Sequence, residues 1–99
     1  MSTRKPQEPW PQTVEEAVTR IVSRLSPANK EQVRATPKRD LTRFHHGWGT
    51  GIRNEFGLWA GNQVLLDDCR RSHPDSASMV IIEAVWERLQ REGGTREGM

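Results

Sequence analysis

Cysteine and tyrosine are almost missing from this sequence: among 99 residues only Cys69 is a cysteine, and there is no tyrosine. A single thiol excludes a disulfide within the chain, which favours the reducing cytoplasm as the compartment. No apolar run approaches the roughly 20 residues that cross a bilayer, and residues 1–12 lack the apolar stretch of a signal peptide. We therefore expect a soluble, cytoplasmic protein without a membrane partner.

A strong surplus of one charge is missing too, since 15 lysines and arginines face 13 aspartates and glutamates. The small excess is concentrated between residues 30 and 43, where basic residues outnumber Glu31 and Asp40. The basic residues are Lys30, Arg34, Lys38, Arg39 and Arg43. Such a cluster suits a solvated helix face or a polyanionic partner, so nucleic-acid binding through residues 30–43 is an alternative function. Phe44 is the one aromatic residue beside it, which argues against stacking on single strands.

Hydrophobic residues are also scarce, at 33% of the chain against 28% charged residues. A chain of this length suits one domain with a small core. With no tyrosine and two phenylalanines, most aromatic surface comes from four tryptophans. We expect three of them in or beside the core: Trp48, Trp59 and Trp86. A buried indole N–H needs a hydrogen-bond acceptor.

The apolar residues recur at helical spacing without strand-like alternation, which predicts an all-α fold, a compact small bundle of three main helices plus two short ones. The first main helix follows the capping-box sequence Thr13–Glu16, in which the threonine hydroxyl accepts an N–H and the glutamate reaches back. Its apolar stripe consists of Val14, Ala17, Val18, Ile21, Val22 and Leu25. Ser26-Pro27 predicts a short second helix to about Ala35, because proline suits the first helical position.

A third helix is predicted after Thr36-Pro37, which repeats that start signal. Its apolar residues follow at spacings of three and four: Leu41, Phe44, Trp48, Ile52 and Phe56. The pattern runs through Gly47, Gly49 and Gly51, and each interior glycine costs about 1 kcal/mol relative to alanine. We favour a continuous or bent helix in which Gly47 and Gly51 form a groove for a close neighbour such as the last helix. The alternative is a break near these glycines.

A short fourth helix is expected after Gly57, which ends the third helix as its first residue beyond the C-cap. Asn62 is the predicted cap of this fourth helix, which covers about residues 63–70. The side chains expected to face inward are Val64, Leu65 and Leu66.

The last helix spans about residues 76–91, after a turn at 72–75, with Asp75 or Ser76 as its cap. It is apolar on most sides, so it is either central to the fold or covered by a partner.

The helical domain therefore covers residues 13–91. We expect residues 1–12 to form an extended arm whose Trp10 docks on the domain, and residues 92–99 to form a disordered tail.

Several patterns that suggest chemistry do not hold up. The glycines around Trp48 match neither a dinucleotide-binding nor a P-loop pattern. Adjacent histidines such as His45 and His46 point apart on a helix, and Cys69 with His73 supplies only half of a zinc set. No arrangement of nucleophile and base is specific enough to propose catalysis. We predict no catalytic residue, no metal and no cofactor.

Arg53, Asn54 and Glu55 form the most prominent polar group. On a helix Glu55 lies near the edge of the apolar stripe, where an unpaired carboxylate is costly. We expect a buried ion pair with an arginine from another helix. The alternative is a small-ligand or enzyme site around His45, Arg53, Asn54 and Glu55.

Several short motifs resemble a family of small bacterial proteins, also found as phage-like genes, that is known only as a domain of unknown function. The resemblance covers residues 9–91. Its motifs are Thr13–Ala17 (TVEEA), Thr36-Pro37, Asp40-Leu41, Ile52–Trp59 (IRNEFGLW), Gly61-Asn62 and His73–Ser78 (HPDSAS) leading into Ile81–Leu89. It implies one compact helical unit and brings no activity, cofactor or site residue.

The function that these observations favour is non-enzymatic protein binding, by an accessory protein that regulates or neutralises another protein. The candidate partner-binding residues are Trp10, Arg53, Asn54 and Trp59. A homodimer is one form that such binding can take.

Overall fold

The computed structural model describes residues 10–97, with the side chains of residues 10–92. These residues form five α-helices and one 3-10 helix, and they include no strand, which confirms the all-α class. The elements are α1 (Val14–Arg24), α2 (Pro27–Ala35), η1 (Lys38–Phe44), α3 (Trp48–Glu55), α4 (Gln63–Cys69) and α5 (Pro74–Glu97). No helix in this part of the chain is long and apolar enough to cross a membrane.

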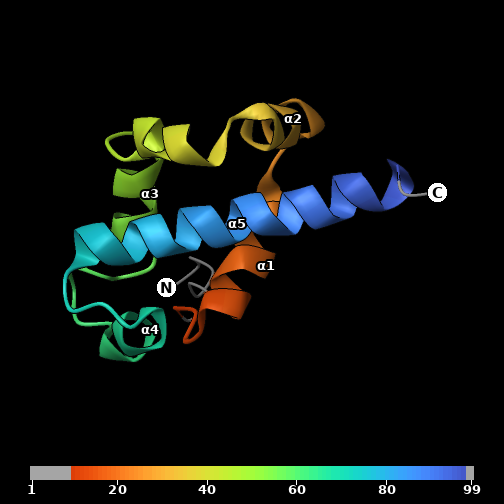
Figure 1. Cartoon of the computed structure of the whole chain (residues 1–99). Coiled ribbons are helices and arrows are strands. Elements are labelled where there is room, and N and C mark those ends of the chain that lie inside the picture. Colours follow the sequence, from red (N-terminus) through yellow and green to blue (C-terminus); the bar gives the residue numbers. More distant parts are fainter. Residues whose placement is uncertain (1–9, 98–99) are drawn as a thin grey trace, which may run out of the picture.

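Helix α5 is the centre of the fold. Figure 1 shows α1 and α4 on one side of α5 and α2, η1 and α3 on the other, and each of these five elements contacts α5. The α5 side chains that are completely buried are Ala77, Ser78, Ile81, Ile82, Val85 and Leu89. A helix surrounded by neighbours must be apolar on most sides, as the sequence of α5 predicts.

The helix starts follow from local capping bonds. The Thr13 hydroxyl accepts the Glu16 N–H at 3.0 Å, and the Ser26 hydroxyl accepts the Asn29 N–H at 3.1 Å. Both starts are as predicted. The Glu16 carboxylate, however, accepts the N–H of Gln12 at 2.8 Å, one residue before the position expected for a capping box. That bond ties the arm to the first turn of α1.

The favoured continuous or bent helix through the three glycines is wrong, and the alternative, a break near these glycines, is what the structure shows. A 3-10 helix ends at Phe44, a turn follows at residues 45–47, and α3 begins only at Trp48. Interior glycines weaken a helix because they lose more backbone entropy than other residues. Phe44 and Trp48, on either side of the turn, pack edge to face, with ring centroids 5.5 Å apart and planes at 89°.

The glycine that packs closely is Gly49, not the expected pair Gly47 and Gly51. A Cβ at Gly49 would lie 3.1 Å from Arg53 Nη1 and 3.5 Å from the Ser78 hydroxyl of α5. A Cβ at either of the other two would meet open space. Gly49 therefore lets α3 approach the first part of α5.

Two of the residues expected to be buried are exposed. Trp59 is 58% exposed and Val64 is 55% exposed. Trp48 and Trp86 are partly buried beside the core, as expected, and the Trp86 indole donates to the Thr36 carbonyl at 2.7 Å.

Helix α5 begins earlier and ends later than expected. His73 Nδ1 accepts the Asp75 N–H at 3.1 Å, so the helix starts at Pro74 and the predicted caps Asp75 and Ser76 lie inside it. It continues through Glu97, beyond the end expected at Arg91, and so its backbone takes in most of the expected tail. Residues 1–9 of the expected arm and 98–99 of the tail lie outside the described residues.

The different surroundings of Gly49 and Gly51 allow a matched test within α3. Gly51→Ala should stabilise the protein by about 0.5–1 kcal/mol, because alanine favours the helix and has room there. Gly49→Ala gains the same propensity but presses on the held Arg53 guanidinium, so it should be at least about 1 kcal/mol less stable than Gly51→Ala. Urea unfolding of both variants measures the difference, and equal stabilities would contradict the close packing of Gly49.

Candidate functional site

The large hydrophobic side chains that are exposed in the described part of the chain lie around one turn. They are Trp10 at 42%, Trp59 at 58% and Val64 at 55% exposure. Trp10 comes from the arm, Trp59 from the turn that joins α3 to α4, and Val64 from the first turn of α4. We call these three residues the apolar surface. Trp10 and Trp59 were predicted as partner-binding residues, and Val64 was not.

A signal for Val64 was present in the sequence. Three consecutive residues of one helix cannot all face the same side, because each is turned by about 100° from the last. Leu65, Leu66 and Cys69 are buried at helical spacing, and this leaves Val64 on the outside. The expectation that residues 64–66 all face inward ignored that geometry.

The arm that carries Trp10 is held against the turn between α3 and α4 by hydrogen bonds from Asn62. The Asn62 side-chain amide donates to the Pro11 carbonyl at 3.0 Å and to the Phe56 carbonyl at 2.8 Å. Gly57 adopts φ of +71°, and a Cβ at this position would overlap the Trp10 indole. A glycine is therefore required here both by the left-handed backbone and by the ring. The predicted docking of Trp10 on the domain is confirmed.

Trp59 packs against His73 at the start of α5. The two ring centroids are 5.7 Å apart with planes at 82°, an edge-to-face arrangement that aromatic rings favour. The His73 ring also accepts the Asp75 N–H of α5, so the indole, although more than half exposed, rests on a side chain that is hydrogen-bonded to the start of α5.

Arg53, which was predicted as a partner-binding residue, lies inside the protein. Its guanidinium donates to the Ser78 hydroxyl at 2.9 Å, the Thr50 hydroxyl at 2.8 Å and the His45 carbonyl at 3.4 Å. Its Nε is 3.4 Å from Asp75 Oδ1. With 6% of the residue exposed, Arg53 joins α3 to α5 and is withdrawn from any surface on which a partner could dock.

The other polar residues of that segment do not converge on Arg53. Asn54 and Glu55 are exposed, and Glu55 pairs with Arg24 of α1. The partner from another helix was predicted, but both side chains are about half exposed, so the ion pair is not buried and contributes little to stability. His45 is half-buried and meets Arg53 through its carbonyl. The structure thus does not assemble His45, Arg53, Asn54 and Glu55 into one pocket.

Part of the basic stretch at residues 30–43 fastens α2 and η1 to α5. Arg34 pairs with Glu31 and also donates to the Leu89 carbonyl at 3.2 Å. Lys38 lies 3.7 Å from the Glu87 carboxylate. The other basic side chains of this stretch are the half-buried Lys30 and the exposed Arg39 and Arg43.

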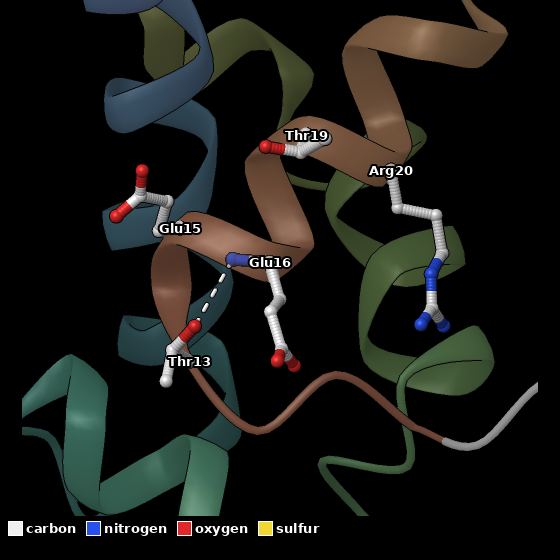
Figure 2. Close-up of a pocket in the computed structure, with 5 residues that line it drawn as sticks. All are labelled: Thr13, Glu15, Glu16, Thr19 and Arg20. Carbon is white, nitrogen blue, oxygen red and sulfur yellow. Dashed lines mark hydrogen bonds between the residues drawn. The ribbon is translucent and has the colours of Figure 1, made fainter.

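A hollow of about 440 Å³ lies on the surface of α1. It is lined by Thr13, Glu15, Glu16, Thr19 and Arg20. Figure 2 shows that the side chains diverge: Glu16 and Arg20 extend to one side of the helix and Glu15 to another. Glu16 already holds the arm, and the Arg20 guanidinium lies 5.9 Å from the centre of the Phe56 ring. The side chains that line this hollow do not converge on a position where a ligand could bind.

Metal-binding groups do not gather in the described part of the chain, where no three histidine, cysteine, aspartate or glutamate side chains are close enough to share an ion. Cys69 is buried, and its thiol lies 3.7 Å from the Ala77 carbonyl. Burial, and to a smaller extent the nearby Asp68 carboxylate, raises the pKa of this thiol to about 11. A protonated, buried thiol is a poor nucleophile.

Comparison with known proteins gives a match to a protein family. Residues 10–89 match a family described as Domain of unknown function (DUF6794). Neither the curated proteins nor the solved structures contain a match to the chain.

The buried position of Arg53 can be tested against its exposed neighbour. Arg53→Ala should destabilise the protein by about 3 kcal/mol, because it removes buried charge-assisted hydrogen bonds between α3 and α5. Asn54→Ala, one residue away and exposed, should change stability by less than about 0.5 kcal/mol. Chemical denaturation of both variants checks this, and similar stabilities would contradict a structural role for Arg53.

The raised pKa of Cys69 predicts that the free energy of unfolding depends on pH. Between pH 9.0, the usual pKa, and about 11 the unfolded thiol ionises while the folded thiol keeps its proton. The folded state then binds more protons than the unfolded state. The stabilising contribution of the buried thiol to the free energy of unfolding is therefore fully present below pH 9 and is lost as pH rises through this range. The difference in unfolding free energy between the unchanged protein and Cys69→Ala should therefore shrink from about pH 8 to about pH 10.5. A constant difference would argue against the raised pKa.

Proposed function

The chain belongs to the family described as Domain of unknown function (DUF6794), and we propose that it is a small, non-enzymatic protein-binding module. The observation that carries this proposal is that the exposed large hydrophobic residues Trp10, Trp59 and Val64 lie in or against the turn between α3 and α4 and the first turn of α4. Single exposed apolar residues are ordinary, but apolar side chains grouped at one place are typical of interaction surfaces. Tryptophan in particular is enriched among the residues that contribute most to binding.

The support beneath the apolar surface fits such a role. Trp10 rests on Gly57, the arm is held by two hydrogen bonds from Asn62, and Trp59 rests on His73. Side chains that are already positioned lose less conformational entropy on binding than mobile ones. The surface thus combines exposure with a defined arrangement.

The proposed setting is an accessory protein that regulates or neutralises another protein in a bacterial or phage context. The bacterial or phage origin rests on the resemblance of the sequence motifs. The reducing cytoplasm fits the single free thiol of Cys69. A second copy of the chain is one partner that the test below detects.

Trp59 and Val64 provide the test of this function. The variant Trp59→Ala/Val64→Ser should retain its helical circular dichroism and lose at least about tenfold of its binding to the physiological partner, since truncating a central aromatic residue costs 2 kcal/mol or more. The measurement is capture from the native host with quantitative mass spectrometry. Light scattering of the purified protein tests self-association.

The matched control is Thr42→Ala, an exposed substitution on η1. It should bind like the unchanged protein. If the double variant captures the same partner to the same extent, the apolar surface is not the binding site. If the unchanged protein dimerises and the double variant does not, the partner is a second copy.

A further inference from the structure

The described part of the arm contacts a turn that is distant from it in sequence. The Trp10 ring covers Gly57, and the side chain of Pro11 is fully buried. The Pro11 carbonyl accepts a hydrogen bond at 3.0 Å from the side chain of Asn62, which is 51 positions further along the chain. Residues 10 and 11 are thus bound like a short peptide, by a site that need not belong to the same molecule.

The arm-binding site, which consists of Phe56, Gly57 and Asn62, is held together by bonds that do not involve the arm. The Asn62 amide also donates to the Phe56 carbonyl at 2.8 Å, and its oxygen accepts the Leu65 N–H at 3.3 Å. The backbone N–H of Asn62 bonds to the Gly57 carbonyl at 3.0 Å. An arm from another copy therefore meets the same groups in the same arrangement.

The hinge between the arm and α1 is short. Two residues, Gln12 and Thr13, separate the docked residues from the helix, and Thr13 is extended at φ −133° and ψ 159°. The start of α1 is fixed independently of the arm, because Asp68 of α4 accepts the Val14 N–H at 2.7 Å. A change of direction at Gln12 breaks the exposed bond between its N–H and Glu16 and leaves the domain as it is. Short hinges of this kind are where copies exchange elements.

We propose that two copies of the chain exchange arms, so that Trp10 of each copy lies on Gly57 of the other. Exchange repeats the contacts between the arm and its binding site, which makes it a low-cost route to a dimer. The inference rests on the proposed binding function and names a second copy as a partner of the apolar surface. In the dimer, that surface is completed by the tryptophan of the other chain.

The exposed residues beside the arm-binding site favour the exchanged form over the closed monomer. Trp10 is four residues from Val14, and an extended chain spans at most about 3.6 Å per residue, so α1 of one copy must start within about 14 Å of the binding site of the other. Trp59 follows Gly57 by two residues, and Val64 lies in the first turn of α4. The closed monomer leaves both side chains more than half exposed, whereas a second domain held this close removes apolar surface from water.

A mixture of two full-length variants tests the exchange. Trp10→Ala keeps the binding site and lacks the ring that covers it. Asn62→Asp keeps the oxygen that caps α4 but turns a carboxylate toward the Pro11 carbonyl, so it keeps the arm and loses the binding site. Each variant alone should remain monomeric, whereas an equal mixture should contain a heterodimer, because an intact arm then meets an intact site. Circular dichroism should show that both variants keep their helices.

Sedimentation velocity between about 1 μM and about 1 mM measures the masses, and the unchanged protein should pass from monomer to dimer over this range. Thr42→Ala, exposed on η1, is the control and should dimerise like the unchanged protein. Arm exchange is wrong if the unchanged protein stays monomeric, if either variant dimerises alone, or if the mixture contains no heterodimer. The protein-binding function stands in each of these cases if Trp59→Ala/Val64→Ser loses a captured host protein, and it fails if that variant captures the same protein equally well.

Discussion

The guanidinium of Arg53 connects the parts of this small protein that the apolar surface depends on. It bonds to Ser78 and pairs with Asp75 in the first turns of α5, and it reaches back to the turn at His45. The carbonyl of the same residue accepts the Leu58 N–H at 3.0 Å, which begins the turn that carries Trp59. The side chain of Arg53 thus contacts the helix that supports the indole, and its backbone carbonyl contacts the turn that presents it.

That connection also explains why a buried charge is kept in a core with little apolar material. Replacing a buried polar cluster by apolar residues is often neutral for stability, so burial of the charge is not needed for folding as such. Arg53 instead joins α3 to Ser78 and Asp75 of α5 by directional contacts, in a space that Gly49 keeps open. Apolar side chains would fill the same space without specifying one arrangement, because dispersion contacts have no preferred direction.

The helix starts at Thr13, Ser26 and Asn62 could be predicted because the deciding hydrogen bonds span three residues. The central place of α5 could be predicted because its apolar residues cover most of its circumference. The break before α3 could not, since Leu41 to Phe56 keep helical spacing whether or not the backbone is continuous. Whether the helix breaks there depends on contacts such as that of Arg53 with Ser78, 25 residues away along the chain. No local sequence pattern contains such a contact. The same limit hid the burial of Arg53, whereas the exposure of Val64 followed from helix geometry alone.

The order of the helices along the chain has a consequence for how the protein comes to be folded. All five elements before α5 pack on it, and apart from α1 with α4 they have few contacts with one another. A ribosome makes α5 after the other five, so the emerging chain carries amphipathic helices that lack the surface they are shaped to cover. Their apolar stripes stay open to chaperones and proteases until Leu89 has left the exit tunnel. Folding of the domain therefore waits until α5 has been synthesised. A domain with contacts between successive helices would bury these apolar stripes earlier.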